Sequence, residues 1–216
     1  MNNIENKQWP ETKLLDFNKK WRARTIPVNV QIDNREVALD LGRTNQILIQ
    51  ADRIALADCI CRETLQNCGF PRNTCLLFNK RADNLVNDGR AKWITREQAK
   101  DIVLETHKQG LVHLAMYQLN NGNQTPSEIC SCCSCCCQAL QGLQRMNMKG
   151  LVESSDLVAF QDSAKCNLCG VCVDRCHFGA IIREDDKIIF NRDFCFGCGL
   201  CVTACPENSI ELHPRK

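Results

Sequence analysis

The sequence reads CNLCGVCVDRC at residues 166–176 and CFGCGLCVTACP at residues 195–206, and these two stretches decide the fold of the C-terminal part. Each has the spacing Cys-x2-Cys-x2-Cys-x3-Cys, which is a ligand pattern of 4Fe–4S clusters. The three closely spaced cysteines bind three corners of one cluster, and the chain carries the fourth cysteine to the neighbouring cluster. The two stretches therefore predict a pair of 4Fe–4S clusters.

The spacing also predicts the ligands of each cluster. The first set is Cys166, Cys169, Cys172 and Cys205, and the second set is Cys195, Cys198, Cys201 and Cys176. A structural zinc site uses four ligands in two separated pairs, which two triplets with a trailing fourth cysteine do not provide. This part of the chain resembles the bacterial-type ferredoxins with two 4Fe–4S clusters, and the resemblance covers roughly the last quarter of the sequence.

Composition narrows the class of protein. The chain has 216 residues, 18 cysteines and a formal net charge of +2, which indicates neither a nucleic acid nor an anionic membrane as partner. No apolar run reaches the length of a membrane span, and the first residues lack the apolar segment of a signal peptide. We therefore expect a cytoplasmic protein, in which thiols stay reduced and many cysteines indicate metal or redox chemistry. Because exposed clusters react with oxygen, we expect an anaerobic host.

The chain divides into three predicted parts. Residues 1–27 form a basic arm, residues 28–150 a small mixed α/β domain that binds further clusters, and residues 151–216 a ferredoxin-like dicluster module, so the fold class is α+β. In the arm, Trp9 and Trp21 are expected to pack on the body or on a second copy, and the alternative is a docking site for an acidic redox partner. The module repeats internally, which implies pseudo-two-fold symmetry.

Several elements of the middle part can be predicted from periodicity and end signals. Residues 28–32 and 37–41 alternate as a hairpin, Thr44 is a candidate N-cap, and Thr95 with Gln98 forms a capping box. Gly110 is expected to end the helix that begins there. The other predicted elements are strands at 54–58, 111–116 and 157–160 and a helix at 138–148.

Ten cysteines precede the module, in two groups. The first group supplies four thiolates, enough for one cluster or for a tetrahedral zinc ion; its members are Cys59, Cys61, Cys68 and Cys75. The second group places six cysteines in eight residues, namely Cys130, Cys132, Cys133, Cys135, Cys136 and Cys137. Adjacent side chains diverge on strands and on helices, so we do not expect all six at one four-metal centre. The six cysteines could instead serve two centres or a single larger cluster, or some of them could be free thiols.

Three short segments add a second resemblance. They are CICR at residues 59–62, GLVH at residues 110–113 and CCSCCC at residues 132–137. Together they resemble an iron–sulfur family of anaerobic bacteria and archaea that carries such segments ahead of a ferredoxin module. The resemblance implies a redox protein with at least one cluster beyond the two ferredoxin clusters, and it implies no particular reaction.

Three further residues are predicted to bind or tune a cofactor. Arg62, beside Cys61, is placed to donate to a cluster sulfur, although an ion pair would also explain it. His113 is a metal ligand or, more simply, a core histidine, and His107 offers a favourable charge near the end of a helix. His177 stands where the repeat has Pro206, so the two cluster environments are expected to differ.

Three functions agree with these features. The first is a relay of low-potential electrons to or from a redox partner protein. The second is reduction of a small molecule at an unusual or high-nuclearity cluster in the N-terminal domain, supplied with electrons by the module. The third is a cluster carrier, or a reductive activator of a partner such as a corrinoid protein. No phosphate loop or dinucleotide fingerprint is present, and enzyme activity and a homodimer both stay open.

Overall fold

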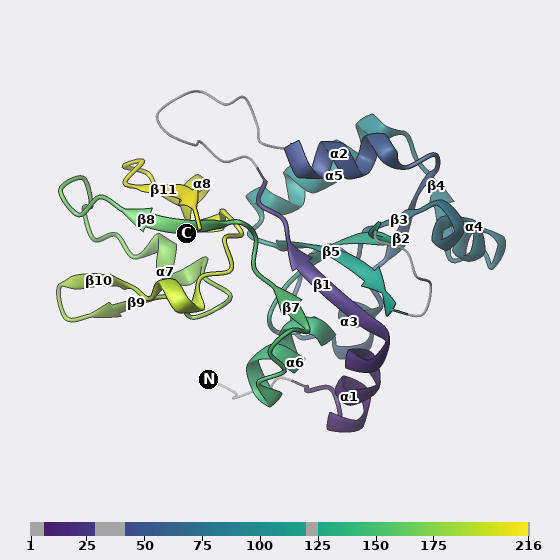
Figure 1. Ribbon diagram of the computed structural model, residues 1–216, viewed down its shortest axis with the longest axis horizontal. Coiled ribbons are helices and arrows are strands. Elements are labelled where there is room, and N and C mark those ends of the chain that lie inside the picture. Colours follow the sequence, from purple (N-terminus) through teal and green to yellow (C-terminus); the bar gives the residue numbers. More distant parts are fainter. Residues whose placement is uncertain (1–6, 29–41, 120–124, 216) are drawn as a thin grey trace.

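The computed structural model describes residues 7–28, 42–119 and 125–215 (Figure 1). The larger part is a seven-stranded sheet with the order β4-β2-β3-β6-β5-β1-β7, in which only the β1–β7 pair is parallel. Its strands are β1 (Trp21–Thr25), β2 (Ile54–Asp58), β3 (Asn73–Phe78), β4 (Ala91–Trp93), β5 (Val112–Gln118), β6 (Glu128–Cys132) and β7 (Val152–Glu153). The predicted α+β class is confirmed. In the described ranges, no helix has both the length and the apolar character that crossing a membrane requires.

One face of the sheet is covered by helices α2 (Gly42–Gln50) and α5 (Arg96–Lys108). Leu48 and Val103 of these helices pack on Leu56, Leu76 and Ile129 of the strands, and all five are buried. Because side chains alternate along a strand, the neighbours of these strand residues point to the opposite face. The strand residues that do not pack on α2 and α5 therefore point to the opposite face of the sheet.

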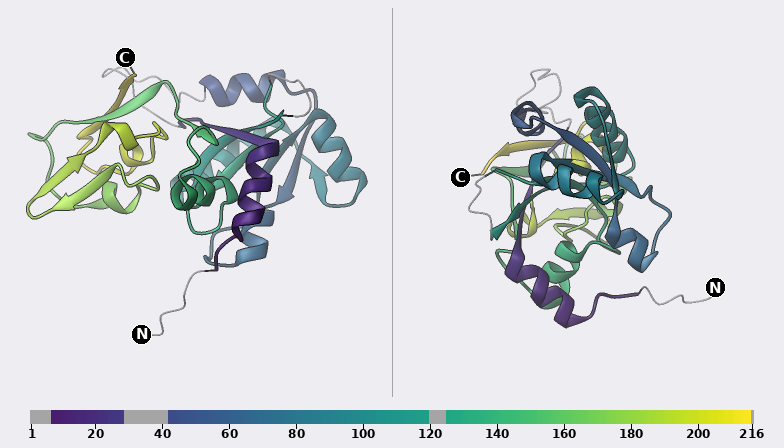
Figure 2. Two further views of the ribbon diagram at one scale, coloured as in Figure 1. Left: turned by 60° about the horizontal axis from the view of Figure 1, so that its bottom comes forward. Right: turned by 90° about the vertical axis from the view of Figure 1, so that its right-hand side faces the viewer.

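The opposite face carries the cysteines. Helices α1 (Glu11–Lys20) and α6 (Gln138–Met146) lie side by side there (Figure 2), and Leu140 packs against Leu114 of β5. Cys130 and Cys132 of β6 belong to this apolar cluster, whereas Ser131 between them bonds to α5. The remaining helices of this part are α3 (Ile60–Leu65) and α4 (Asn79–Asn87).

The described part of residues 1–27 packs on the body and adds strand β1 to the large sheet. Strand β1 pairs with β5 and β7, because buried Ala23 and Thr25 alternate with the arginines of the basic run. Trp21 stacks on Phe17 with ring centroids 6.0 Å apart and carries the guanidinium of Arg81 at 5.5 Å. The tryptophan therefore packs on the body.

The predicted local elements agree with the structure in most places. Strand β2 has the predicted bounds, and in the capping box the amide of Gln98 donates to Thr95 Oγ1 at 3.2 Å while the amide of Thr95 donates to Gln98 Oε1 at 2.8 Å. Helix α2 begins at Gly42, so Thr44 lies inside the helix and the prediction of an N-cap there is wrong. The predicted hairpin at 28–41 lies outside the described residues except for Val28, which is in no strand.

The C-terminal module contains two antiparallel pairs. Strands β8 (Leu157–Gln161) and β11 (Ile210–Pro214) form one, and β9 (Ile181–Glu184) and β10 (Lys187–Phe190) form the other. Its helices are α7 (Val171–Asp174), η2 (Arg192–Phe194) and α8 (Leu200–Ala204). Both α7 and α8 follow a glycine in the left-handed region, Gly170 with φ 82° and Gly199 with φ 81°. The repeated sequence therefore adopts the same turn twice.

Candidate metal centres

In the module, the cysteine thiols interact mainly with members of their own predicted set, and Cys201 also interacts with Cys172 of the other set. Burial and the neighbouring thiols of its own set raise the pKa of Cys172 to about 11. Burial and the thiols of Cys176 and Cys195 raise the pKa of Cys198 to about 12. Such thiols are protonated without metal and release protons when they bind iron. The neighbours of Cys172 are Cys166, Cys169 and Cys205, and those of Cys201 include Cys176, Cys195 and Cys198.

His177 connects the module to the N-terminal domain. Its Nε2–H donates to the carbonyl of Gly110 at 2.7 Å, and its Nδ1 accepts from the hydroxyl of Ser134 at 3.2 Å. Beside it, Arg175 donates to the carbonyl of Lys108 at 3.0 Å. A proline, as in the other half of the repeat, offers no side-chain hydrogen bond. His177 is therefore a docking residue next to Cys176, and its neighbour Ser134 lies in the CCSCCC segment.

An apolar cluster spans the same interface. Leu200, Phe196 and Cys198 of the module pack in one cluster with Cys132 and Cys137 of the N-terminal domain. Phe196 also stacks on Phe178 with ring centroids 4.4 Å apart. One cysteine of the second predicted ligand set, Cys198, thus shares a hydrophobic cluster with two cysteines of the other part.

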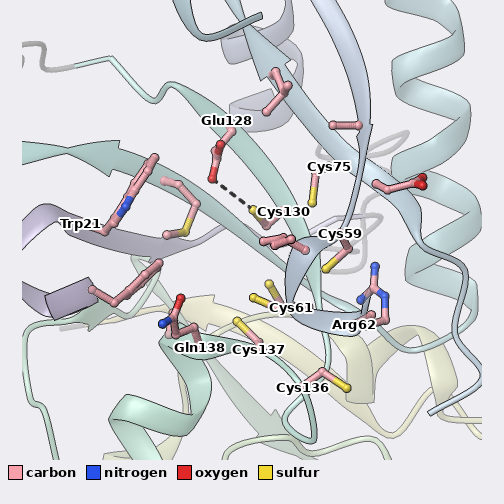
Figure 3. A pocket seen from close by; sticks show the side chains of 18 of the residues that line it. Trp21, Cys59, Cys61, Arg62, Cys75, Glu128, Cys130, Cys136, Cys137 and Gln138 are labelled. Atoms are coloured by element: carbon pink, nitrogen blue, oxygen red, sulfur yellow. Dashed lines mark hydrogen bonds between the residues drawn. The ribbon is translucent and has the colours of Figure 1, made fainter. Parts of the chain in front are cut away.

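Eight of the ten N-terminal cysteines line one cavity, and six of these form a connected group that we call the six-thiol set. Thiol–thiol interactions connect them in the order Cys61, Cys59, Cys75, Cys130, Cys132 and Cys137. Figure 3 shows side chains from β3, β6, α3 and the start of α6 turned toward this space. The cavity has a volume of about 240 Å³. Hydrogen bonds with the thiols of Cys61 and Cys75 lower the pKa of Cys59 below its ordinary value.

Charged side chains line one end of this cavity. Cys130 donates to Glu128 at 3.7 Å, and Arg81 Nε donates to the same carboxylate at 3.2 Å. Burial raises the pKa of Glu128. Neither Glu128 nor Arg81 was predicted as a site residue. Glu128 could have been found, because it lies two residues before Cys130 on β6 and alternation along the strand places Glu128 and Cys130 on one face.

Arg62 is a buried cation beside these thiols. It is 2% exposed, donates to the carbonyl of Ser131 at 2.8 Å and to the hydroxyl of Thr74, and takes part in none of the ion pairs between described residues. Its charge interacts with Cys59, Cys132 and Cys133. Because a buried charge without a counter-charge is costly, an anionic metal centre held by these thiolates fits the site.

The other four N-terminal cysteines form a separate group, the four-thiol set, made of Cys68, Cys133, Cys135 and Cys136. Their sulfur atoms all lie within 4.8 Å of one another. Cys137 directly follows this set in the chain and yet belongs to the six-thiol set. A tight turn separates them, in which the amides of Cys136 and Cys137 both bond to the carbonyl of Cys133.

This division differs from the grouping expected along the sequence. Cys68 had been grouped with Cys59, Cys61 and Cys75 as one set of four ligands, but it lies in the loop after α3, against the CCSCCC turn. The other three cysteines face strand β6. Spacing along the chain did not predict this, because the pairing of β3 with β6 brings together residues that are far apart in sequence.

His113 lies away from the thiols. It is on the α5 side of the sheet, where its ring stacks on His107 with centroids 5.7 Å apart and its Nδ1 contacts the hydroxyl of Ser131 at 3.2 Å. His113 therefore supports the strand that carries Cys130 and Cys132 and does not reach the cavity. Burial lowers the pKa of His107 to about 4, so the prediction of a charged side chain at the helix end is wrong.

The two histidines make stability depend on pH. Burial lowers the pKa of His113 to about 3 and of His107 to about 4, whereas an unfolded histidine titrates near 6.5. Between these values the unfolded chain binds more protons than the folded chain. The contribution of the two histidines to the free energy of unfolding is therefore complete above pH 6.5 and falls as the pH drops toward 4. Each histidine should contribute up to ~1.4 kcal/mol per pH unit. Urea unfolding should show that the free energy of unfolding decreases less between pH 7.5 and pH 5.5 in His113→Gln than in the natural chain. Equal decreases in the two proteins would contradict this.

The fold and the paired cysteine sets define an iron–sulfur protein, and the comparisons agree. Residues 165–210 match the family of 4Fe-4S dicluster domains. The chain is 45% identical over 52 residues to the pyruvate synthase subunit PorD of Thermotoga maritima, covering 24% of this chain and 52% of that protein. It is 35% identical over 57 residues to PorD of Methanothermobacter marburgensis, which covers 26% of this chain and 67% of that protein. It is 33% identical over 48 residues to the uncharacterized ferredoxin MJ0199 of Methanocaldococcus jannaschii, which covers 22% of this chain and 77% of that protein. Through this segment, the chain belongs to the ferredoxin-type 4Fe–4S dicluster proteins, which are electron-transfer proteins.

Proposed function

We propose that the protein relays low-potential electrons between the two clusters of the module and a further metal centre held by the six-thiol set. The observation that supports this most is the shared apolar cluster of Cys132, Cys137, Cys198 and Leu200. In this cluster, the proposed ligands of both centres belong to one apolar region. When bound, the clusters supply one-electron redox chemistry, and the protein fixes their positions, their hydrogen bonds and their exposure.

A redox partner protein and a cytoplasmic location belong to the same proposal. Two of the relatives are named as subunits of pyruvate synthase, which supports a partner protein for this chain as well. The location is supported by the number of cysteines, because such a chain keeps its thiols only in a reducing compartment.

The relay is tested at the docking surface between the two parts. A Cβ atom at Gly110, which has φ +94°, would lie 2.1 Å from Arg175 Nη1, so Gly110→Ala should move the Arg175 side chain away from the carbonyl of Lys108 and weaken the docking of the module. Gly89→Ala is the matched control, because Gly89 also has a positive φ, +68°, but open space around it. After rapid mixing with a limiting low-potential donor, freeze-quench electron paramagnetic resonance should show reduction of the N-terminal centre in the natural chain and in Gly89→Ala, and slower reduction in Gly110→Ala. An N-terminal centre that stays oxidised in the natural chain while the module is reduced would refute the relay.

A second function is favoured by the size of the thiol set. Six thiols exceed the four that bind one cubane, and the cavity of about 240 Å³ also contains Glu128 and Arg81. The proposal of small-molecule reduction at a larger cluster rests on this surplus. Spectroscopy of the N-terminal centre with and without candidate substrates would separate it from a pure relay, since only a reductase reoxidises when substrate is added.

A further inference from the structure

The four-thiol set has the dimensions of a single-ion site. Cys68 Sγ lies 3.7 Å from Cys133 Sγ and 3.9 Å from Cys136 Sγ, and the sulfurs of Cys135 and Cys136 are 3.8 Å apart. A tetrahedral ion with metal–sulfur bonds of ~2.3 Å holds its four sulfurs ~3.8 Å from one another. Three of the six sulfur–sulfur distances therefore match the edges of such a tetrahedron, and the other three are at most 4.8 Å.

The module provides an internal comparison. In a cubane each cysteine binds a different iron, so the thiolates stand farther apart than around one ion. Across the described residues, which include all 18 cysteines, the four-thiol set is the one group of three or more metal-binding side chains whose donor atoms all lie within 4.8 Å. The two cysteine sets of the cubane-binding module are not gathered so closely.

We propose that the four-thiol set binds one tetrahedral metal ion, zinc or iron, and not a 4Fe–4S cluster. Cys133 and Cys136 also border the six-thiol cavity, whereas Cys68 and Cys135 are not among its lining residues. The inference does not depend on the proposed relay, because a single thiolate-bound ion can serve the fold without transferring electrons.

The surroundings of the set are arranged to hold the loop in one conformation. The side chains of Asn67 and Gln141 donate to the carbonyl of Cys135 at 2.7 and 2.9 Å, and Trp9 Nε1 donates to the carbonyl of Cys136 at 2.8 Å. These bonds join three separate segments at the loop. Outer hydrogen bonds of this kind orient the ligands of a metal site.

Five of the nine members of the hydrophobic cluster at this place are cysteines, so an ion that binds four of them would hold much of this cluster together. Leu65 and Leu111 are the buried non-cysteine members of the cluster around Cys133 and Cys136. A bound ion would tie the loop of Cys68 to the CCSCCC turn and keep Ser134 in place for His177. Arg62, which interacts with Cys133, offsets part of the negative charge of four thiolates on a divalent ion.

The test counts metal and acid-labile sulfide per chain in anaerobically purified Cys68→Ser protein. Cys68 belongs to this set alone and lies in a partly exposed loop. We expect the variant to lose about one metal atom and no sulfide, because a single ion needs no bridging sulfide. Loss of about four irons together with about four sulfides would show a cubane and overturn the proposal. An unchanged metal content would also overturn it.

A second measurement on the natural chain avoids any folding defect of the variant. Elemental analysis decides between zinc and iron. If zinc is found, X-ray absorption at its edge should show four sulfur neighbours and no second metal nearby. If only iron is found, Mössbauer spectra should contain one isolated tetrahedral site, and spectra of clusters alone would overturn the proposal. Failure of the relay is distinguishable, since it changes the order of reduction and leaves these metal counts intact.

Discussion

Replacement of Cys198 by alanine is expected to remove one of the two clusters of the module, with a loss of about four irons and about four sulfides per chain. Cys198 shares its surroundings with Cys176, Cys195 and Cys201, and burial keeps its free thiol protonated. The lost cluster is the one beside the interface with Cys132 and Cys137. The variant should therefore also fail to reduce the N-terminal centre. Iron and sulfide analysis with electron paramagnetic resonance measures both effects.

Cys169→Ala is the matched control for this prediction. Cys169 is exposed and belongs to the other predicted set, with Cys166, Cys172 and Cys205. Its replacement should remove a similar amount of iron but leave the cluster at the interface in place. Unchanged iron content and spectrum in Cys198→Ala would refute the assignment of its ligand set.

Arg62→Met is expected to weaken retention of the N-terminal metal centre by ~10–100-fold. The buried guanidinium is close to the thiols of Cys59, Cys132 and Cys133, and it stabilises negative charge there. Its loss should also shift the reduction potential of the centre to a more negative value, since the oxidised and more weakly anionic state is then favoured. Metal release to a chelator and a redox titration measure the two effects.

Arg53→Met is the control for the loss of an arginine. Arg53 is exposed and pairs with Asp83 at the surface, so its replacement should change neither retention nor potential. The same metal retention in Arg62→Met and in the natural chain would contradict an anionic centre next to Arg62.

The sequence predicted the module better than the N-terminal domain, for a physical reason. Closely spaced ligands such as Cys195, Cys198 and Cys201 must surround one cluster, because their short spacers allow no other arrangement. Capping signals are local as well, and Thr95 with Gln98 marked the start of α5 correctly. Strand β1 was not predicted, since a basic run indicates a solvated surface unless the partner strand is known.

The division of the ten N-terminal cysteines depends on long-range pairing. Cys75 faces Cys130 only because β3 pairs with β6, and Cys68 meets Cys133 only because the loop after α3 folds onto the CCSCCC turn. His177 was singled out for replacing a proline, but its hydrogen bonds to Gly110 and Ser134 follow from the docking of the two parts. Alternation along β6 was the one signal that separates Ser131 from its two cysteine neighbours.

The most direct test of the relay counts iron, acid-labile sulfide and reactive thiols in one anaerobic sample of the natural chain. A metal centre held by the six-thiol set predicts more than about nine irons per chain, since a single iron at the four-thiol set adds only one, together with protection of the six cysteines of the six-thiol set from a thiol reagent. About eight irons, with all ten N-terminal thiols free to react, would contradict it.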